Sequence, residues 1–355
     1  MLFTIHGMLD PHTHLRSLRW AHKGTFRTET EAALAGGYWA IFDMPNTPPS
    51  TINRASLDEK LAEIRAQAIC DWGLYVGASQ LQLDTYDDLL PDIIGMKMYC
   101  NATTGDLLIE NPHIREHHFQ HWTNRKPIAV HAEEETMAEI IALVRKYRKQ
   151  THFCHVCTAR EVAYIRAAKA EGLPISAGVC PHHLFLTEAD LPHLGSYGMM
   201  KPTLKTQADQ DALWRGIQED VIDLVESDHA PHTQAEKASA EPPFGVPGLQ
   251  TTLPLLFNAV EEKRLTRDRL EELVADAPQR IFGIQLPDET FTVIDLSEKY
   301  VIDHAQIRSS CGWTPFHGMN GVGKIREVWI RGVKVFDGEN VLVEDGFGQA
   351  VNQTL

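Results

Sequence analysis

Short apolar runs alternate along the chain with segments of helical periodicity. Strands are predicted for the apolar runs at 38–44, 72–78, 93–99, 127–133, 150–156, 174–180 and 221–230. Apolar residues spaced three and four apart predict helices at 55–68, 135–149 and 159–172. Strands that alternate with helices imply right-handed crossovers and a parallel sheet. About seven or eight such units in roughly 280 residues predict a (β/α)8 TIM barrel, of the α/β class, rather than an open sheet.

The pattern changes near residue 286. The segment 325–345 alternates apolar and polar residues around the turn signal Asp337-Gly338, which predicts an antiparallel pair or triplet of strands. We therefore expect residues 8–285 to form the barrel. Residues 286–355, together with 1–7, are expected to form a small, mostly C-terminal β-subdomain and a C-terminal extension.

Composition narrows the possible partners and the compartment. The 355 residues carry a net charge of −15 and are 43% hydrophobic, so nucleic acid and anionic membranes are excluded as expected partners. The N-terminal stretch lacks the features of a signal peptide, and no apolar run reaches the ~18 residues of a membrane span. We expect a cytoplasmic protein whose six cysteines are reduced core residues. Cys154 and Cys157 form a single C-x-x-C, which is weak evidence for a zinc knuckle or redox motif.

Residues able to bind metal fall at the ends of predicted strands. His12 and His14 are two residues apart, so their imidazoles lie on one face of a strand. His131, His155 and Asp228 each follow a later strand. Because the C-terminal ends of barrel strands converge on one mouth, these five side chains predict a metal site there. His182 and His183 are ambiguous, and the histidines taken as structural or surface residues are His6, His22, His113, His117, His118, His121, His152, His193, His304 and His317.

Lys97 lies in the apolar run "GMKMYC" and is expected to be buried in a strand. A buried lysine must find an anion, lose its charge or be chemically changed. Reaction of its amine with carbon dioxide would give a carbamate whose two oxygens could bridge two cations. A salt bridge from Lys97 to Asp228 or Glu133 is the alternative.

Eleven motifs in order resemble dihydroorotase of the amidohydrolase superfamily, and most closely the kind fused into the animal multifunctional pyrimidine-synthesis protein. The motifs are "DPHTHLR", "AALAGGY", "DMPNT", "GMKMY", "VHAEEET", "THFCHV", "CPHHLFLTEADL", "SDHAPHT", "EKASAEPPFGVPGLQTTLPLL", "RIFGI" and "WTPFHG". The resemblance implies the reversible cyclisation of N-carbamoyl-L-aspartate to L-dihydroorotate and water, in pyrimidine biosynthesis. A hydroxide bridging two metal ions would attack, with Asp228 as general acid and base.

The resemblance also implies the cofactor and the substrate contacts. Two zinc ions would be bridged by carbamylated Lys97, one held by His12, His14 and Asp228 and the other by His131 and His155. The substrate carboxylate would be bound by Arg16, Asn46 and His232. The remaining substrate contacts would come from Thr103 on the loop 100–106, Lys201 in place of the usual Asn or Arg, and the backbone of Pro247 and Gly248.

Several other positions depart from the family pattern. Ser17-Leu18-Arg19 stands where relatives have Glu-Pro-Gly, and Gly24-Thr25 where acidic residues are common. Thr104 replaces a bulkier apolar residue, which puts closure of the loop 100–106 in doubt. Gly178 replaces an acid that helps bind an extra zinc in the animal enzyme, so a third metal on His183 is not expected.

Two other functions remain open. A dihydropyrimidinase or allantoinase would use the same metal chemistry, but Arg16 and Asn46 favour a charged substrate. A non-catalytic, dihydroorotase-like partner of aspartate transcarbamoylase usually lacks metal ligands, and none is missing here. A homodimer is expected, and association with aspartate transcarbamoylase is possible alongside activity.

Overall fold

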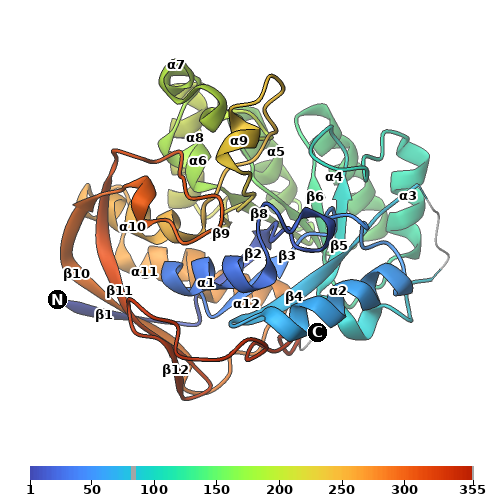
Figure 1. Cartoon of the computed structure of the whole chain (residues 1–355). Coiled ribbons are helices and arrows are strands. Elements are labelled where there is room, and N and C mark those ends of the chain that lie inside the picture. The colour runs from blue at the N-terminus through green and yellow to red at the C-terminus, as the bar shows by residue number, and fades with distance from the viewer. Residues whose placement is uncertain (81–84, 354–355) are drawn as a thin grey trace.

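The computed structural model, described here for residues 1–80 and 85–353, is built around a ring of eight parallel strands (Figure 1). The strands follow one another in chain order around the ring: β2 (Leu9–Thr13), β3 (Ala40–Asp43), β4 (Asp71–Gly77), β5 (Gly95–Tyr99), β6 (Ile128–His131), β7 (Thr151–Phe153), β8 (Ile175–Val179) and β9 (Leu224–Val225). A parallel bridge from Thr13 to His229 joins the last strand region to the first. The predicted TIM barrel is confirmed.

Helices surround this ring. The longer ones are α1 (Phe26–Gly36), α2 (Arg54–Gln67), α3 (Pro112–His121), α4 (Glu135–Tyr147), α5 (Ala159–Ala170), α8 (Gln207–Gln218) and α10 (Leu249–Glu261). Shorter helices are α6 (Pro181–Phe185), α7 (Leu191–Leu194), α9 (Gln234–Lys237), α11 (Arg267–Glu271) and α12 (Ala277–Phe282). The predicted helices α2 and α5 begin where expected because Asn53 and Thr158 cap them, each accepting a hydrogen bond from a first-turn amide.

Some strands are shorter than their apolar runs. The run 221–230 was expected to be one strand, but only Leu224–Val225 pairs with β8. The chain leaves the ladder after that because Asp228 has a positive φ of 45°. His155, just past β7, likewise has a φ of 38°. Positive φ is costly for residues other than glycine, and such strain concentrates at functional sites.

A four-stranded antiparallel sheet lies beside the barrel, at the lower left of Figure 1. Its order is β1 (Leu2–His6), β10 (Phe291–Val301), β11 (Asn320–Ile330) and β12 (Val333–Phe336), so three of its four strands are C-terminal. The expected triplet exists, since Phe336 also bridges Val341 across the turn at Asp337. A second turn at Arg331–Gly332 joins β11 to β12 and was not predicted.

The segment after this sheet returns to the barrel. Gln349 and Val351 exchange backbone hydrogen bonds with Trp72 of β4, each at 2.9 Å. A separate apolar cluster around Trp313 and Phe316 packs beside the loops after β8 and β9. Parts of the C-terminal region are therefore attached to barrel strands and loops as well as to the sheet.

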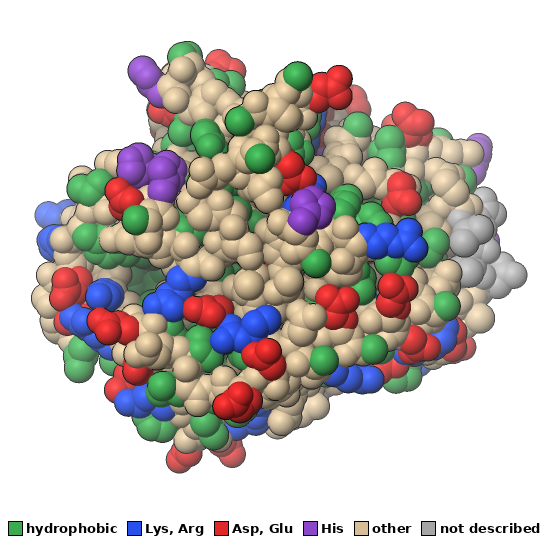
Figure 2. All heavy atoms as spheres, viewed as in Figure 1, with side chains coloured by type: hydrophobic (Ala, Val, Ile, Leu, Met, Phe, Trp, Pro, Cys, Tyr) green, Lys and Arg blue, Asp and Glu red, His purple; other side chains and the backbone are tan. Residues whose placement is uncertain are grey.

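The surface shows no concentration of one charge on the face seen in Figure 2, where acidic and basic side chains are interspersed. Among the described residues no helix has the length and apolar content needed to cross a membrane. All six cysteines are buried and unpaired, as expected from the sequence.

Candidate functional site

Three of the predicted metal ligands meet at the C-terminal ends of the barrel strands. One ligand atom each from His12, His155 and Asp228 lies within 4.8 Å of the others, and all three residues are buried. His14 joins them, because its Nε2 lies 3.0 Å from Asp228 Oδ1, while His12 Nε2 lies 3.3 Å from the same oxygen. Asp228 is therefore shared between both histidines of the "HTH" pair.

His131 lies next to this group rather than inside it. Its ring centroid is 4.6 Å from that of His155, but its Nε2 faces Glu133 Oε1 at 3.1 Å. On the other side the ring contacts Tyr99, whose buried hydroxyl has no hydrogen-bond partner. His131 can join the site only through its other ring nitrogen or by exchanging Glu133 for a cation.

The donors present fit a divalent cation. Burial and the nearby ammonium of Lys97 lower the pKa of His12 to about 4, and burial together with His131 lowers the pKa of His155 well below its ordinary value. Both imidazoles are neutral at pH 7, which is the form that binds metal. Burial alone would raise the pKa of Asp228, but His12 and His14 hold it below its ordinary range, so it remains a carboxylate. Neutral imidazoles with one carboxylate form a zinc-type donor set.

Lys97 is completely buried and has no anion beside it. Its Nζ donates to Cys154 Sγ at 3.1 Å and lies 5.3 Å from the centre of the Tyr99 ring. Among residues 1–80 and 85–353 no carboxylate oxygen lies within 4.0 Å of this nitrogen; Glu133 pairs with His131, and Asp228 with the two histidines. The salt-bridge alternative for Lys97 therefore has no partner in this structure.

Glu226 is a residue at this site that the sequence did not single out. It is fully buried, accepts a 2.6 Å hydrogen bond from the amide of His155, and approaches His12 Nδ1 at 3.4 Å and His152 Nε2 at 3.2 Å. Burial alone would raise the pKa of Glu226, but His12 and His152 hold it well below its usual range. A carboxylate behind a ligating imidazole fixes its orientation. The only sequence signal was its position beside "SDHAPH".

The ambiguous pair His182 and His183 lies with Cys180 in a second buried group, with one ligand atom from each within 4.8 Å of the others. His182 Nε2 and His183 Nδ1 have no hydrogen-bond partner. His183 Nε2 lies 3.1 Å from the carbonyl oxygen of Pro202, so that nitrogen carries the proton. The pair is therefore buried rather than on the surface.

Arg16 provides a buried cation on the substrate side. It is 1% exposed, and its Nε donates to the carbonyl of Pro231 at 3.0 Å. Its Nη2 lies 3.2 Å from His232 Nε2, and its Nη1 has no partner. Burial lowers the pKa of Arg16 to about 10, so it stays charged at pH 7. A buried guanidinium with unused donors is suited to a carboxylate.

His232 is buried among further cations. Its Nδ1 lies 3.2 Å from Lys23 Nζ, and its Nε2 lies 3.0 Å from the carbonyl oxygen of Phe244. Burial, with Arg16 and Lys23 nearby, lowers the pKa of His232 far below its ordinary value. The imidazole is therefore neutral, and the positive charge comes from Arg16 and Lys23.

The loop 100–106 closes over this side of the site. Asn46 Nδ2 donates to the Thr104 carbonyl at 2.8 Å, and Asn46 Oδ1 lies 2.8 Å from His14 Nδ1. Thr104 Oγ1 in turn donates to the Phe244 carbonyl at 3.2 Å. The loop is thus held by Thr104 itself, the residue whose small size raised doubt about closure. Thr103, its half-buried neighbour, makes no hydrogen bond among the described residues.

The remaining predicted contacts lie around the same opening. The Nζ of half-buried Lys201 is 4.8 Å from the centre of the Phe244 ring. Pro247 and Gly248 line a narrow pocket with His229, and the Gly248 amide donates to His229 Nδ1 at 3.2 Å. Arg16, Asn46, Lys201 and Pro247–Gly248 are therefore joined through contacts with Phe244 and the 228–232 segment.

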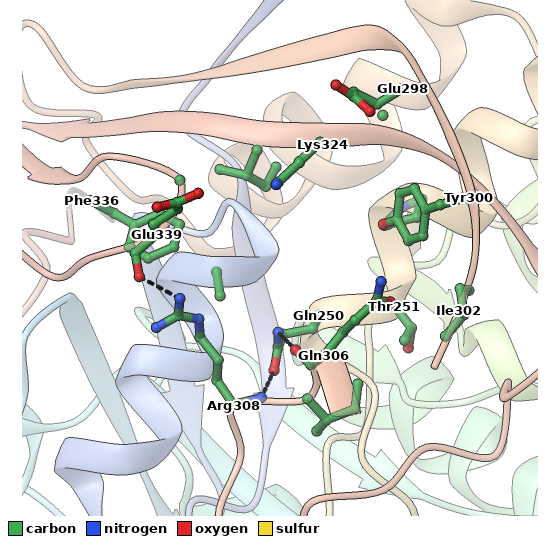
Figure 3. A pocket seen from close by; sticks show the side chains of 16 residues that line it. Gln250, Thr251, Glu298, Tyr300, Ile302, Gln306, Arg308, Lys324, Phe336 and Glu339 are labelled. Carbon is green, nitrogen blue, oxygen red and sulfur yellow. Dashed lines mark hydrogen bonds between the residues drawn. The ribbon is translucent and has the colours of Figure 1, made fainter. Parts of the chain in front are cut away.

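A separate cavity of about 440 Å³ lies between α10 and the sheet strands β10 and β11 (Figure 3). Its cation Arg308 is already bonded to Glu31 and to the Glu339 carbonyl, and its amide to Gln250. None of the predicted catalytic or substrate residues lines it. This cavity is therefore separate from the cluster of predicted ligands at the barrel mouth.

No family model matches the chain. Individual proteins do: it is 40% identical over 353 residues to the "Multifunctional protein CAD" of Squalus acanthias, of which it spans only 16%, and 32% identical to a dihydroorotase of Halobacterium salinarum, of which it spans 88%. Among solved structures, an L-hydantoinase (dihydropyrimidinase) from Arthrobacter aurescens superposes with a TM-score of 0.91 at 25% identity, over 99% of this chain and 89% of that one.

Proposed function

Because the chain belongs to the dihydroorotase family of the amidohydrolase superfamily, we propose that it catalyses the reversible cyclisation of N-carbamoyl-L-aspartate to L-dihydroorotate and water. The observation that supports this most directly is the pairing of two features at one barrel mouth. A cluster of neutral imidazoles around Asp228 lies there together with Arg16, a buried cation with an unused donor. The first suits amide hydrolysis and the second suits an anionic ring.

We propose a pair of zinc ions as the cofactor. His12, His14 and Asp228 would hold one ion, His131 and His155 the other, and Lys97 as its carbamate would bridge them. Bound there, the metal would lower the pKa of water to about 7 and polarise the amide carbonyl. Within residues 1–80 and 85–353 no carboxylate oxygen lies within 4.0 Å of Lys97 Nζ, which donates to Cys154 and lies near the Tyr99 ring, and this supports the modified form.

Asp228 is the proton carrier in this proposal. Its carboxylate takes the proton of the attacking water and delivers it to the ring nitrogen that leaves. In the direction of ring closure it removes the proton from that nitrogen and gives it to the departing oxygen. His12 Nε2 and His14 Nε2 lie 3.3 and 3.0 Å from Oδ1, so the carboxylate is placed beside both proposed ligands, and its burial keeps competing water away.

Arg16 and its neighbours select the substrate. Arg16 binds the ring carboxylate with its free Nη1, and the neutral imidazole of His232 helps orient the guanidinium. Asn46 links this contact to the loop 100–106, whose Thr103 would complete the enclosure. Lys201 adds positive charge at the rim, and the backbone of Pro247 and Gly248 forms the wall against the ring. An uncharged hydantoin or dihydrouracil leaves the buried guanidinium unpaired, which is costly.

The test compares L-dihydroorotate with hydantoin and dihydrouracil as substrates of the zinc-loaded protein, and measures bound metal on the same sample. We expect kcat/KM for L-dihydroorotate to exceed that for either uncharged ring by at least about 100-fold, the cost of an unpaired buried charge. A preference for hydantoin would reassign the protein to the dihydropyrimidinases. Full metal content without hydrolysis of any ring would make it a non-catalytic relative.

We further propose that the chain works as a homodimer, beside aspartate transcarbamoylase, in the cytoplasm. The match within a multifunctional protein supports a physical association with other steps of pyrimidine synthesis. Six buried, unpaired cysteines suit a reducing compartment. Sedimentation of the protein alone, and then with aspartate transcarbamoylase, measures both associations directly.

A further inference from the structure

His229 directly follows Asp228, yet nothing in the motif pattern gives it a role. The structure makes it the link between the two sides of the site. Its backbone carbonyl accepts a 2.7 Å hydrogen bond from the amide of His14, and its amide donates to Ser227 Oγ at 3.0 Å. Its ring Nδ1 accepts the 3.2 Å hydrogen bond from the amide of Gly248. Movement of His229 would therefore shift a metal ligand and the substrate wall together.

A buried carboxylate determines which ring nitrogen of His229 carries the proton. Glu29, on α1, is completely buried, and its Oε2 lies 2.8 Å from His229 Nε2. Because Nδ1 accepts from Gly248, Nε2 must carry the hydrogen and donate it to Glu29. The other oxygen, Oε1, accepts from Thr28 Oγ1 at 2.9 Å and from the amide of Ser310 at 3.1 Å. Both carboxylate oxygens are thus fixed.

Glycine at position 24 makes room for this carboxylate. A Cβ built on Gly24 would lie 2.7 Å from Glu29 Oε1 and 2.9 Å from its Cγ, both too close. Any side chain at 24 therefore excludes the present position of Glu29. Conversely, a glutamate at 24 would direct its own carboxyl into the space that Glu29 fills. The two positions can supply the same carboxylate, but only one of them at a time.

We propose that Glu29 is a positioning residue of the active site. It holds His229 in the Nε2-protonated form, so that Nδ1 captures the Gly248 amide and fixes the orientation of the Pro247–Gly248 wall. The effect of the Pro247–Gly248 wall on substrate binding rests on the proposed function, whereas the tautomer of His229 does not. Loss of the carboxylate frees His229 to move its proton to Nδ1, which removes the acceptor for Gly248 and releases the wall.

Four variants test this: Glu29→Ala, Gly24→Glu, the double variant of both, and Glu31→Ala as a control on the same helix, where Glu31 pairs with Arg27 and Arg308. Glu29→Ala is expected to raise KM for L-dihydroorotate about tenfold, with kcat and metal content nearly unchanged, as for loss of a supporting partner. Gly24→Glu alone is expected to destabilise the protein by crowding. The double variant is expected to regain wild-type KM, and Glu31→Ala to keep it.

The tautomer is read independently from the ¹⁵N shifts of the His229 ring. Wild type and the double variant should show the proton on Nε2, and Glu29→Ala a mixture or the Nδ1 form; Glu29→Leu, which also has no acceptor, replaces it if the alanine variant does not fold. An unchanged tautomer in the variant without the carboxylate, or failure of the double variant to restore KM, overturns the proposal. If the wild type does not act on L-dihydroorotate, the proposed function fails, while the ring shifts still decide the role of Glu29.

Discussion

Lys60 and Lys97 are both completely buried, and their surroundings are opposite. Lys60, on α2, donates to Asp43 Oδ2 at 2.7 Å and to the Met44 carbonyl at 2.9 Å. Lys97, inside the barrel, donates to the thiol of Cys154 and lies 5.3 Å from the centre of the Tyr99 ring, and no carboxylate oxygen of the described residues lies within 4.0 Å of its Nζ. The region around Lys60 therefore neutralises its charge, whereas the barrel mouth does not.

The difference separates a structural cation from a functional one. A buried charge without a counter-ion is unfavourable and persists only where another group or a chemical change compensates it. Arg16 repeats the pattern on the substrate side, since its Nη1 has no partner. Among the described residues neither Lys97 nor Arg16 has a carboxylate partner at the mouth; the proposed carbamate would remove the positive charge of Lys97, and the proposed substrate carboxylate would pair with Arg16.

Lys97→Ala should produce the largest change. Without the bridging group we expect little bound metal and a loss of about 10⁴-fold in kcat/KM, since the metal supplies several kcal/mol of barrier reduction. Bound zinc and turnover are measured together. Partial recovery with a short-chain carboxylic acid is expected, because it can replace the carbamate oxygens. Normal metal content in this variant would contradict the bridging role.

Asp228→Asn should have the second largest effect on turnover. The amide cannot carry the proton between water and ring nitrogen, so kcat is expected to fall about 10³-fold, within the usual range for general acid–base catalysis. Thermal unfolding of the variant should remain cooperative and close to wild type. Retention of even about a tenth of the activity would exclude Asp228 as the proton carrier.

Lys60→Met tests whether the paired lysine, Lys60, contributes to stability. It leaves Asp43 buried without its cation, and we expect the free energy of unfolding to fall by about 3 kcal/mol. The matched change, Lys97→Met, removes an unpaired charge and should leave the stability of the metal-free protein unchanged or higher. Chemical denaturation of both variants provides the measurement. Equal destabilisation by the two variants would contradict the assignment of Lys60 as a structural cation and Lys97 as a functional one.

Arg16→Lys should have the smallest effect. A lysine keeps the charge but loses the forked donors, so KM for L-dihydroorotate is expected to rise about tenfold with little change in kcat. Arg19→Lys, three residues on and exposed, is the control and should leave both constants unchanged. A similar KM in both variants would remove Arg16 from the carboxylate contact.

The periodicity of apolar residues was enough to predict the barrel, because the buried face of each strand or helix is visible in the spacing of its own apolar residues. β5 and β6 lie inside the apolar runs that predicted them, and α4 begins at Glu135 as expected. The run at 221–230 misled because apolar residues continue past the point where Asp228 takes a positive φ. Backbone turns of that kind leave no mark on hydrophobic spacing.

The sequence predicted those site residues that belong to recognisable motifs. His12 and His14 share Asp228 because all three lie at or just past the C-terminal ends of strands, a local signal. Glu226 could not be found this way, because its carboxylate fills space left by Gly178, on a different strand: a Cβ there would lie 2.5 Å from Glu226 Oε1. A contact of this kind, between residues on two different strands, leaves no local signal at either position and is visible only in the structure.

The sheet order also bears on how the protein is made. β1 leaves the ribosome long before its pairing partner β10, which begins at Phe291. Its neighbour β2 can pair early with β3, but the bridge to His229 that joins it to the far side of the barrel forms much later. Contacts so distant in sequence form slowly. The nascent chain must therefore keep β1 unpaired, and shielded from aggregation, until β10 has been made.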